Sequence, residues 1–163
     1  MNRSRNRPGA MGAHGSAEWR LVRCPPVALS GIKGMFVPGL CCRSDIWEEA
    51  SARLPGVDVV ALDWPWPERL GSYDDGAAWL ADEIRAHRPH FVVGHSFGGV
   101  LALHLCSQMQ PRPEWHLVLA GVPTSAGQDV RAVPGTSHFP MLERPEEFYA
   151  TLRDVLKIKS SPL

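Results

Sequence analysis

Apolar residues along the chain occur in short runs of β-favouring side chains, and each run soon meets a glycine or a proline. The clearest run is FVV at 91–93, which is followed at once by a glycine. Runs of this length and composition, bounded by turn residues, predict buried strands. The predicted strands lie at 33–37, 58–62, 91–93 and 115–120, with a short edge strand at 19–24.

Between these strands, apolar residues recur every three or four positions, which is the spacing of one side of a helix. The first such segment, 44–54, starts at Ser44, a residue type that caps helices. The second starts after Ser72, has Asp75 three residues later as in a capping box, and stops before a proline. The third runs over 97–110. The residues expected to face inward on the first two helices are Ile46, Trp47, Ala50, Leu54, Ala77, Leu80, Ala81 and Ile84.

Strands that alternate with helices predict an α/β fold of three layers, in which a mostly parallel sheet has helices on both faces. Sheets of this kind carry their functional groups at the carboxyl ends of the strands. The segment DVRAV, which starts at Asp129, is expected to begin the last strand.

The return from Ala120 to that last strand is short. Only eight residues separate Ala120 from Asp129, and a parallel crossover usually needs a dozen or more. Eight extended residues span about 26 Å, whereas a five-residue strand is about 17 Å long. An extended return therefore just fits. A chain that turned back antiparallel would instead carry the residues that follow to the wrong edge of the sheet.

Composition indicates one globular domain. The chain has 163 residues, 44% of them hydrophobic and 21% charged, and its 17 basic and 17 acidic side chains give a net charge of zero. This balance does not favour a nucleic acid partner, and no apolar run is long enough to span a membrane. We expect a disordered tail at 1–18, a single domain at 19–158 and a flexible C-terminus at 159–163.

The N-terminal segment and the cysteines bear on location and metal content. Residues 1–18 are basic at the start but lack the apolar run of a secretory signal, which favours a cytoplasmic protein. The four cysteines form no CxxC pair, and Cys41 and Cys42 are adjacent. This spacing suits neither a zinc site nor a disulfide framework, so we expect reduced thiols and no metal.

The strongest chemical pattern is GHSFG at 94–98, which has the form G-x-S-x-G and joins a predicted strand to a predicted helix. A serine on so sharp a turn has a strained backbone that only small neighbours accommodate. The turn lifts the Ser96 hydroxyl clear of the sheet, and the start of the next helix offers free N–H groups to developing negative charge. The pattern therefore predicts a nucleophile beside an oxyanion site. The alternative is a small-residue turn that only packs the helix closely on the sheet.

At these residues the chain resembles the α/β-hydrolase superfamily. VVGHSFGG looks like the nucleophile elbow of that family, and FVPGL looks like the segment that supplies the second oxyanion donor. The segment VPGTSHFPMLERPEEFYATL, 133–152, is similar to the one that carries the catalytic histidine. The resemblance implies that Ser96 is the nucleophile, that His138 is the general base, and that the N–H groups of Leu40 and Phe97 form the oxyanion hole. It also implies a reduced α/β-hydrolase fold that lacks the cap and a late strand–helix unit.

The third member of the triad is the open question. Only 42 positions separate Ser96 from His138, several times fewer than is usual in the family. Asp129 is the carboxylate between Ala120 and His138, and it either orients His138 or is a solvated residue at the end of a strand. Asp63, after the second predicted strand, is a weaker candidate.

The resemblance implies a hydrolase that cleaves a carboxylic ester or thioester through an acyl-enzyme on Ser96. We expect no metal and no organic cofactor, a small-molecule acyl substrate, and an open site because no cap covers it. The alternative is a catalytically degenerate member that acts as a binding or partner module. In that case the sheet face left by the missing helix would favour self-association into a homo-oligomer or a partner subunit. A third hypothesis is a lyase, or an oxygenase that needs no cofactor, on the same fold.

Overall fold

The computed structural model describes residues 18–21, 31–65, 71–109, 114–122, 129–132 and 134–158. Within these residues, six strands form one sheet in the order β3-β2-β4-β5-β1-β6. Their bounds are β1 Glu18–Leu21, β2 Ile32–Val37, β3 Val57–Ala61, β4 Phe91–His95, β5 His116–Ala120 and β6 Asp129–Ala132. The predicted tail up to residue 17 and the predicted C-terminal segment 159–163 lie outside the described residues.

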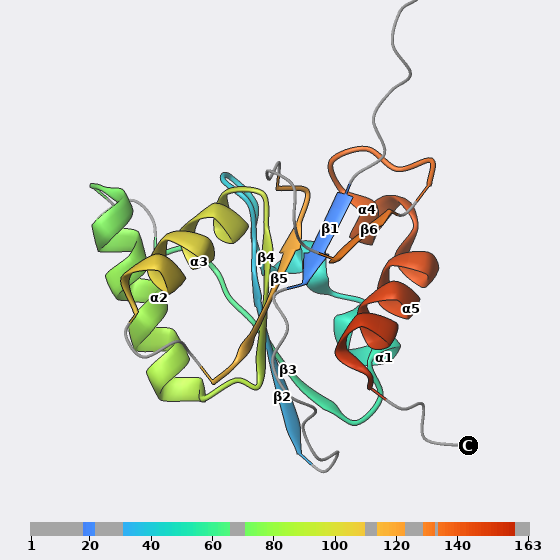
Figure 1. The fold of residues 1–163 in the computed structure, drawn as a ribbon, viewed down its shortest axis with the longest axis horizontal. Helices are drawn as coiled ribbons and strands as arrows, with labels where there is room; N and C mark the ends of the chain where they lie inside the picture. The colour runs from blue at the N-terminus through green and yellow to red at the C-terminus, as the bar shows by residue number, and fades with distance from the viewer. Residues whose placement is uncertain are drawn as a thin grey trace, which may run out of the picture.

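The four strands β3, β2, β4 and β5 are parallel neighbours, as predicted. Helices α2 (Tyr73–His87) and α3 (Phe97–Gln108) cover one face of the sheet. The other face carries the short 3-10 helix η1 (Ser44–Trp47) and the helices α1 (Ala50–Arg53), α4 (Pro140–Glu143) and α5 (Pro145–Leu156), as Figure 1 shows. The predicted α/β class, a mostly parallel sheet between two helical layers, is confirmed.

Alternate residues of the central strands fill two separate cores. In β4, Phe91 and Val93 join the core under α1, α4 and α5, and Val92 joins the core under α2 and α3. The same alternation holds in β5, where Val118 and Leu119 face opposite sides. Strands buried on both faces are expected to read as continuous apolar runs, which is why the sequence pattern located them.

Strand β1 does not have the predicted place. It was expected at the edge, over 19–24, but it runs from Glu18 to Leu21 between β5 and β6 and is antiparallel to both. Four residues carry too little pattern to reveal two pairing partners. Because β5 and β6 are both antiparallel to β1, β6 runs in the same direction as β5. The chain after β6 therefore emerges at the edge where β4 and β5 end, and the antiparallel alternative is excluded.

The helix predicted over 44–54 is wrong as one continuous element. It is divided into η1 and α1, and Arg43, not Ser44, occupies the N-cap position of η1. The Ser44 N–H instead donates to Asp63 Oδ1 at 2.7 Å, so a carboxylate from another segment binds a donor in the first turn of η1. The inward face was predicted correctly, since Trp47, Ala50 and Leu54 are buried.

Helix α2 agrees with its predicted cap. The Ser72 side chain accepts a hydrogen bond from the Asp75 N–H at 3.1 Å, and its hydroxyl donates to Asp75 Oδ2 at 2.9 Å. The helix ends at His87, and the left-handed Arg88 follows before the proline.

Candidate active site

Ser96 lies between β4 and α3 with an unusual backbone conformation. Its φ is 49° and its ψ is −119°, a combination that non-glycine residues adopt only when the surrounding structure holds them there. The Ser96 N–H donates to the Ala120 carbonyl at 2.8 Å, which fixes the turn to the end of β5. The side chain is half-buried at the start of a twelve-residue helix. This strained turn is the geometry that the G-x-S-x-G pattern predicts.

The two flanking glycines are required by close packing. A Cβ atom at Gly94 would lie 2.5 Å from the Cα and 2.7 Å from the N of Gly99, within the first turn of α3. A Cβ atom at Gly98 would overlap the Pro38 carbonyl oxygen and would lie 2.8 Å from the Val37 carbonyl oxygen. The elbow can therefore approach both its own helix and the end of β2 only because these side chains are absent.

The segment after β2 passes directly beside the elbow. A Cβ atom at Gly39 would lie 3.2 Å from the Ser96 Cβ. The Gly39 carbonyl accepts hydrogen bonds from the Trp64 indole at 2.8 Å and from the Cys42 N–H at 3.1 Å. Because a peptide is planar and trans, these bonds also fix the Leu40 N–H, which points away from both donors. Leu40 directly follows Gly39 and Phe97 directly follows Ser96, so the two predicted oxyanion donors belong to the two segments that meet at this turn.

His138 lies next to the residue that precedes Ser96. The His138 carbonyl accepts a hydrogen bond from His95 Nε2 at 2.8 Å, and the two imidazole rings are 4.8 Å apart. At the end of β5, a Cβ atom at Gly121 would lie 3.4 Å from His138 Nδ1. The short return therefore brings His138 to the edge that holds the elbow. Within the described residues, no hydrogen bond joins the His138 ring to the Ser96 hydroxyl; such bonds are often long in free enzymes and tighten when substrate binds.

The predicted acids have different positions. Asp129 is the first residue of β6, and its side chain lies outside what the structure describes. Asp63 binds the Ser44 N–H, which lowers the pKa of the Asp63 carboxyl, and its Oδ1 is 3.9 Å from Arg43 Nε. Asp63 is thus engaged with the loop before η1.

Glu143 is a site residue that the sequence analysis missed. Its carboxylate accepts hydrogen bonds from the Ser137 N–H at 2.7 Å, the Ser137 hydroxyl at 2.5 Å and the Phe139 N–H at 3.1 Å, on both sides of His138. The Ser137 hydroxyl is the main cause of the lowered pKa of Glu143. The available signal was an acidic residue five positions after the candidate histidine, within the segment that resembles the family.

The sequence model of the alpha/beta hydrolase family matches residues 35–129, which is more than half of the chain. This chain belongs to the alpha/beta hydrolase family. The match runs from β2 to the start of β6 and includes the elbow, and it supports the predicted reduced α/β-hydrolase fold. His138 and Glu143 lie beyond the matched residues of this alpha/beta hydrolase.

One curated protein is similar to this chain in sequence, and one solved structure is similar to it in fold. A putative 2-succinyl-6-hydroxy-2,4-cyclohexadiene-1-carboxylate synthase from Haemophilus influenzae is 31% identical over an 84-residue alignment, and the match covers 47% of this chain and 34% of the synthase. The match thus spans about a third of the length of that relative. Among solved structures, the esterase EaEST from Exiguobacterium antarcticum is 17% identical with a TM-score of 0.48, and the superposition covers 91% of this chain and 60% of the esterase.

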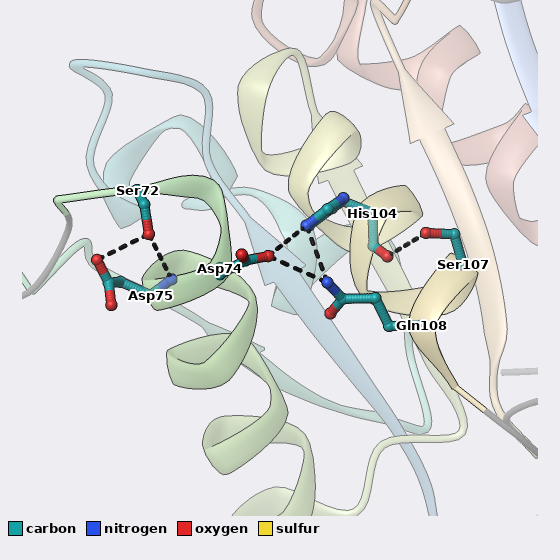
Figure 2. A network of polar contacts seen from close by, with 6 residues as sticks. All are labelled: Ser72, Asp74, Asp75, His104, Ser107 and Gln108. Atoms are coloured by element: carbon teal, nitrogen blue, oxygen red, sulfur yellow. Dashed lines mark hydrogen bonds and ion pairs between the residues drawn. The ribbon is translucent and has the colours of Figure 1, made fainter.

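A second serine, histidine and carboxylate occur together on the two helices α2 and α3 of this alpha/beta hydrolase. Figure 2 shows that Asp74 Oδ1 on α2 binds His104 Nε2 at 2.9 Å and the Gln108 amide at 3.1 Å, both on α3. The Ser107 hydroxyl, however, donates to the His104 backbone carbonyl at 2.7 Å and not to the ring. This network joins the two helices and cannot activate a nucleophile, because the serine proton is not directed at the imidazole.

Across the residues that the structure describes, no group of three or more histidine, cysteine or acidic side chains could hold a metal ion. In the same residues, no helix has the length and apolar character needed to cross a bilayer.

His95 makes the stability of this alpha/beta hydrolase depend on pH. The ring is fully buried, and burial lowers the pKa of His95 below its ordinary value of 6.5. Below that value the unfolded chain binds a proton that the folded chain does not, so stability is present above pH 6.5 and is lost as the pH falls below it. We expect the melting temperature to fall as the pH is lowered from 7 towards the pKa of His95 in the folded chain. This fall should be smaller in His95→Phe than in the control His87→Gln. Equal pH slopes in both variants would contradict this assignment.

Proposed function

We propose that this chain is a serine hydrolase that cleaves a carboxylic ester or thioester through an acyl-enzyme on Ser96. The observation that carries the proposal is the strained Ser96 turn, at the start of α3, with His138 beside the preceding residue. Membership of the alpha/beta hydrolase family supports the same chemistry.

In the proposed mechanism, the His138 imidazole takes the Ser96 proton as the hydroxyl attacks the substrate carbonyl. The carbonyl oxygen becomes negatively charged, and the N–H groups of Leu40 and Phe97 stabilise it. When the tetrahedral intermediate collapses, the leaving alcohol or thiol receives the proton from His138. A water molecule then attacks the acyl-enzyme by the same route, and Ser96 regains its proton.

The surroundings of Ser96 favour an apolar acyl or leaving group. Leu40, in the oxyanion segment, is 51% exposed although its side chain is large and apolar. Phe97, the residue after the nucleophile, packs against Trp64 at 5.5 Å and Tyr73 at 5.6 Å between ring centroids, and Tyr73 is 54% exposed. Exposed apolar side chains next to a nucleophile offer a surface on which a hydrocarbon group is removed from water.

The proposal is tested with an alkyl fluorophosphonate and with p-nitrophenyl acetate. We expect intact-mass spectrometry to show one phosphonyl group on Ser96, and p-nitrophenol to be released in a burst as the acyl-enzyme forms. Ser96→Ala should show neither. A folded chain that is not labelled and releases no p-nitrophenol would overturn the proposal and would favour the non-enzymatic binding module.

The synthase relative supports a second candidate, in which the same elbow serves a synthase-type reaction and transfers no acyl group to water. The two reagents separate the candidates, because fluorophosphonate labelling reports an activated serine and the burst reports acyl transfer. Labelling of Ser96 without a burst would favour the synthase-type reaction.

A further inference from the structure

The segment that carries His138 is held by one carboxylate. Glu143, the last residue of α4, binds the N–H groups of Ser137 and Phe139 and the Ser137 hydroxyl through its two oxygens. The main chain adds to this, because the Glu143 N–H donates to the Phe139 carbonyl at 3.0 Å. A glutamate at a solvent-exposed helix end usually interacts with water, so three protein donors on one carboxylate is a specific arrangement.

The same segment is held from the opposite side by His95. The buried His95 ring donates its Nε2 proton to the His138 carbonyl at 2.8 Å and packs against the tilted Phe139 ring with centroids 4.9 Å apart. Its Nδ1 has no hydrogen-bond partner within the described residues. Among these residues, the ring forms its hydrogen bond with the His138 carbonyl.

These contacts meet on a single peptide unit. The carbonyl of His138 and the N–H of Phe139 belong to the same planar group, and His95 binds one end while Glu143 binds the other. Bonds at both ends of the plane oppose its rotation, and they therefore restrict the direction in which the His138 side chain leaves the backbone. Within the described residues, which do not include the Asp129 side chain, the hydrogen bonds at this position are made by the His138 backbone.

We propose that Glu143 and His95 are positioning residues that jointly hold the 138–139 peptide so that the His138 imidazole faces Ser96. The inference rests on the proposed role of His138 as the general base. In a complete triad, the acid orients the imidazole of the general base. Here Glu143 and His95, which belong neither to the proposed nucleophile and base nor to the oxyanion donors, would share that task.

The test compares Glu143→Ala, Glu143→Gln and His95→Phe with the control Glu147→Ala, in which an exposed glutamate of α5 loses its bond to Arg144. We expect Glu143→Ala and His95→Phe to lower the rate constant for fluorophosphonate labelling of Ser96 by about tenfold to a hundredfold, since a small displacement of a catalytic group has effects of this size. The kcat for p-nitrophenyl acetate should fall while KM changes little. Glu143→Gln, which keeps an acceptor oxygen, should be intermediate, and Glu147→Ala should match the unmodified protein.

A double variant sharpens the test. If the two bonds hold one peptide, the loss of either bond releases it. The double variant, Glu143→Ala with His95→Phe, should therefore be labelled at Ser96 little more slowly than the slower of the two single variants. Independent structural damage would instead multiply the two effects. Labelling rates of both single variants equal to that of the unmodified protein, or multiplied effects in the double variant, would overturn the proposal.

A third readout does not need activity. Amide hydrogen exchange measured by NMR should be faster at Ser137 and Phe139 in Glu143→Ala than in Glu147→Ala. If the unmodified chain is not labelled at all, the proposed hydrolase function fails, and the exchange rates alone decide whether Glu143 holds this peptide. Unchanged exchange at both amides would overturn the positioning role.

Discussion

Replacing His138 by alanine is expected to lower kcat for p-nitrophenyl acetate by about a thousandfold, because the Ser96 hydroxyl then has no base to take its proton. His138 is exposed, so the variant should keep a melting temperature within about 2 °C of the unmodified protein. Steady-state kinetics and a thermal melt on the same preparation check both expectations.

The matched control is His104→Ala. His104 is also a histidine beside a carboxylate, but it binds Asp74 across the two helices α2 and α3 (Figure 2) and has no part in the proposed proton path. Activity should be retained in this variant. A His138→Ala protein that hydrolyses the ester at an undiminished rate would show that another group acts as the base.

Replacing Gly98 by alanine should have the largest effect on stability. The new Cβ would meet the carbonyl oxygens of Pro38 and Val37, which are backbone atoms at the end of β2 and cannot move aside as a flexible side chain can. We expect the free energy of unfolding to fall by about 3 kcal/mol or more, which is a drop in melting temperature of roughly 6–12 °C for a chain of this size.

Gly71→Ala is the control for this substitution. Its new Cβ would lie 3.3 Å from the end of the Asp75 side chain at an exposed position, so its effect should stay within about 0.5 kcal/mol. Equal stabilities of the two variants would contradict the close approach of α3 to the end of β2.

The sequence predicted the strained turn at Ser96 because its constraints are local. A run of apolar residues locates β4, and the glycines at 94 and 98 appear where a serine turn needs small neighbours. The core strands were found for a related reason, since burial on both faces leaves a continuous apolar signal. The cap of α2 was found because Ser72 and Asp75 are three residues apart in sequence and interact directly.

The parts that were missed depend on contacts between distant segments. Asp63 binds the N–H of Ser44, which changed the start of the first helical segment, and no spacing pattern reports a bond across 19 positions. Strand β1 gains its place from two partners, β5 and β6, that lie about a hundred residues away along the chain. The hydrogen bond of His95 and two of the three that Glu143 accepts are made to backbone atoms, and a side chain that binds backbone leaves no complementary residue in the sequence to be recognised.

The separation between Ser96 Oγ and His138 Nε2 in a crystal structure of the fluorophosphonate-labelled protein tests the central claim most directly. The proposed general base requires these atoms to lie at hydrogen-bond distance, roughly 3 Å, once a tetrahedral group occupies the site. An imidazole that remains more than about 6 Å from the labelled serine, with another side chain or solvent against Ser96 Oγ, would contradict the account.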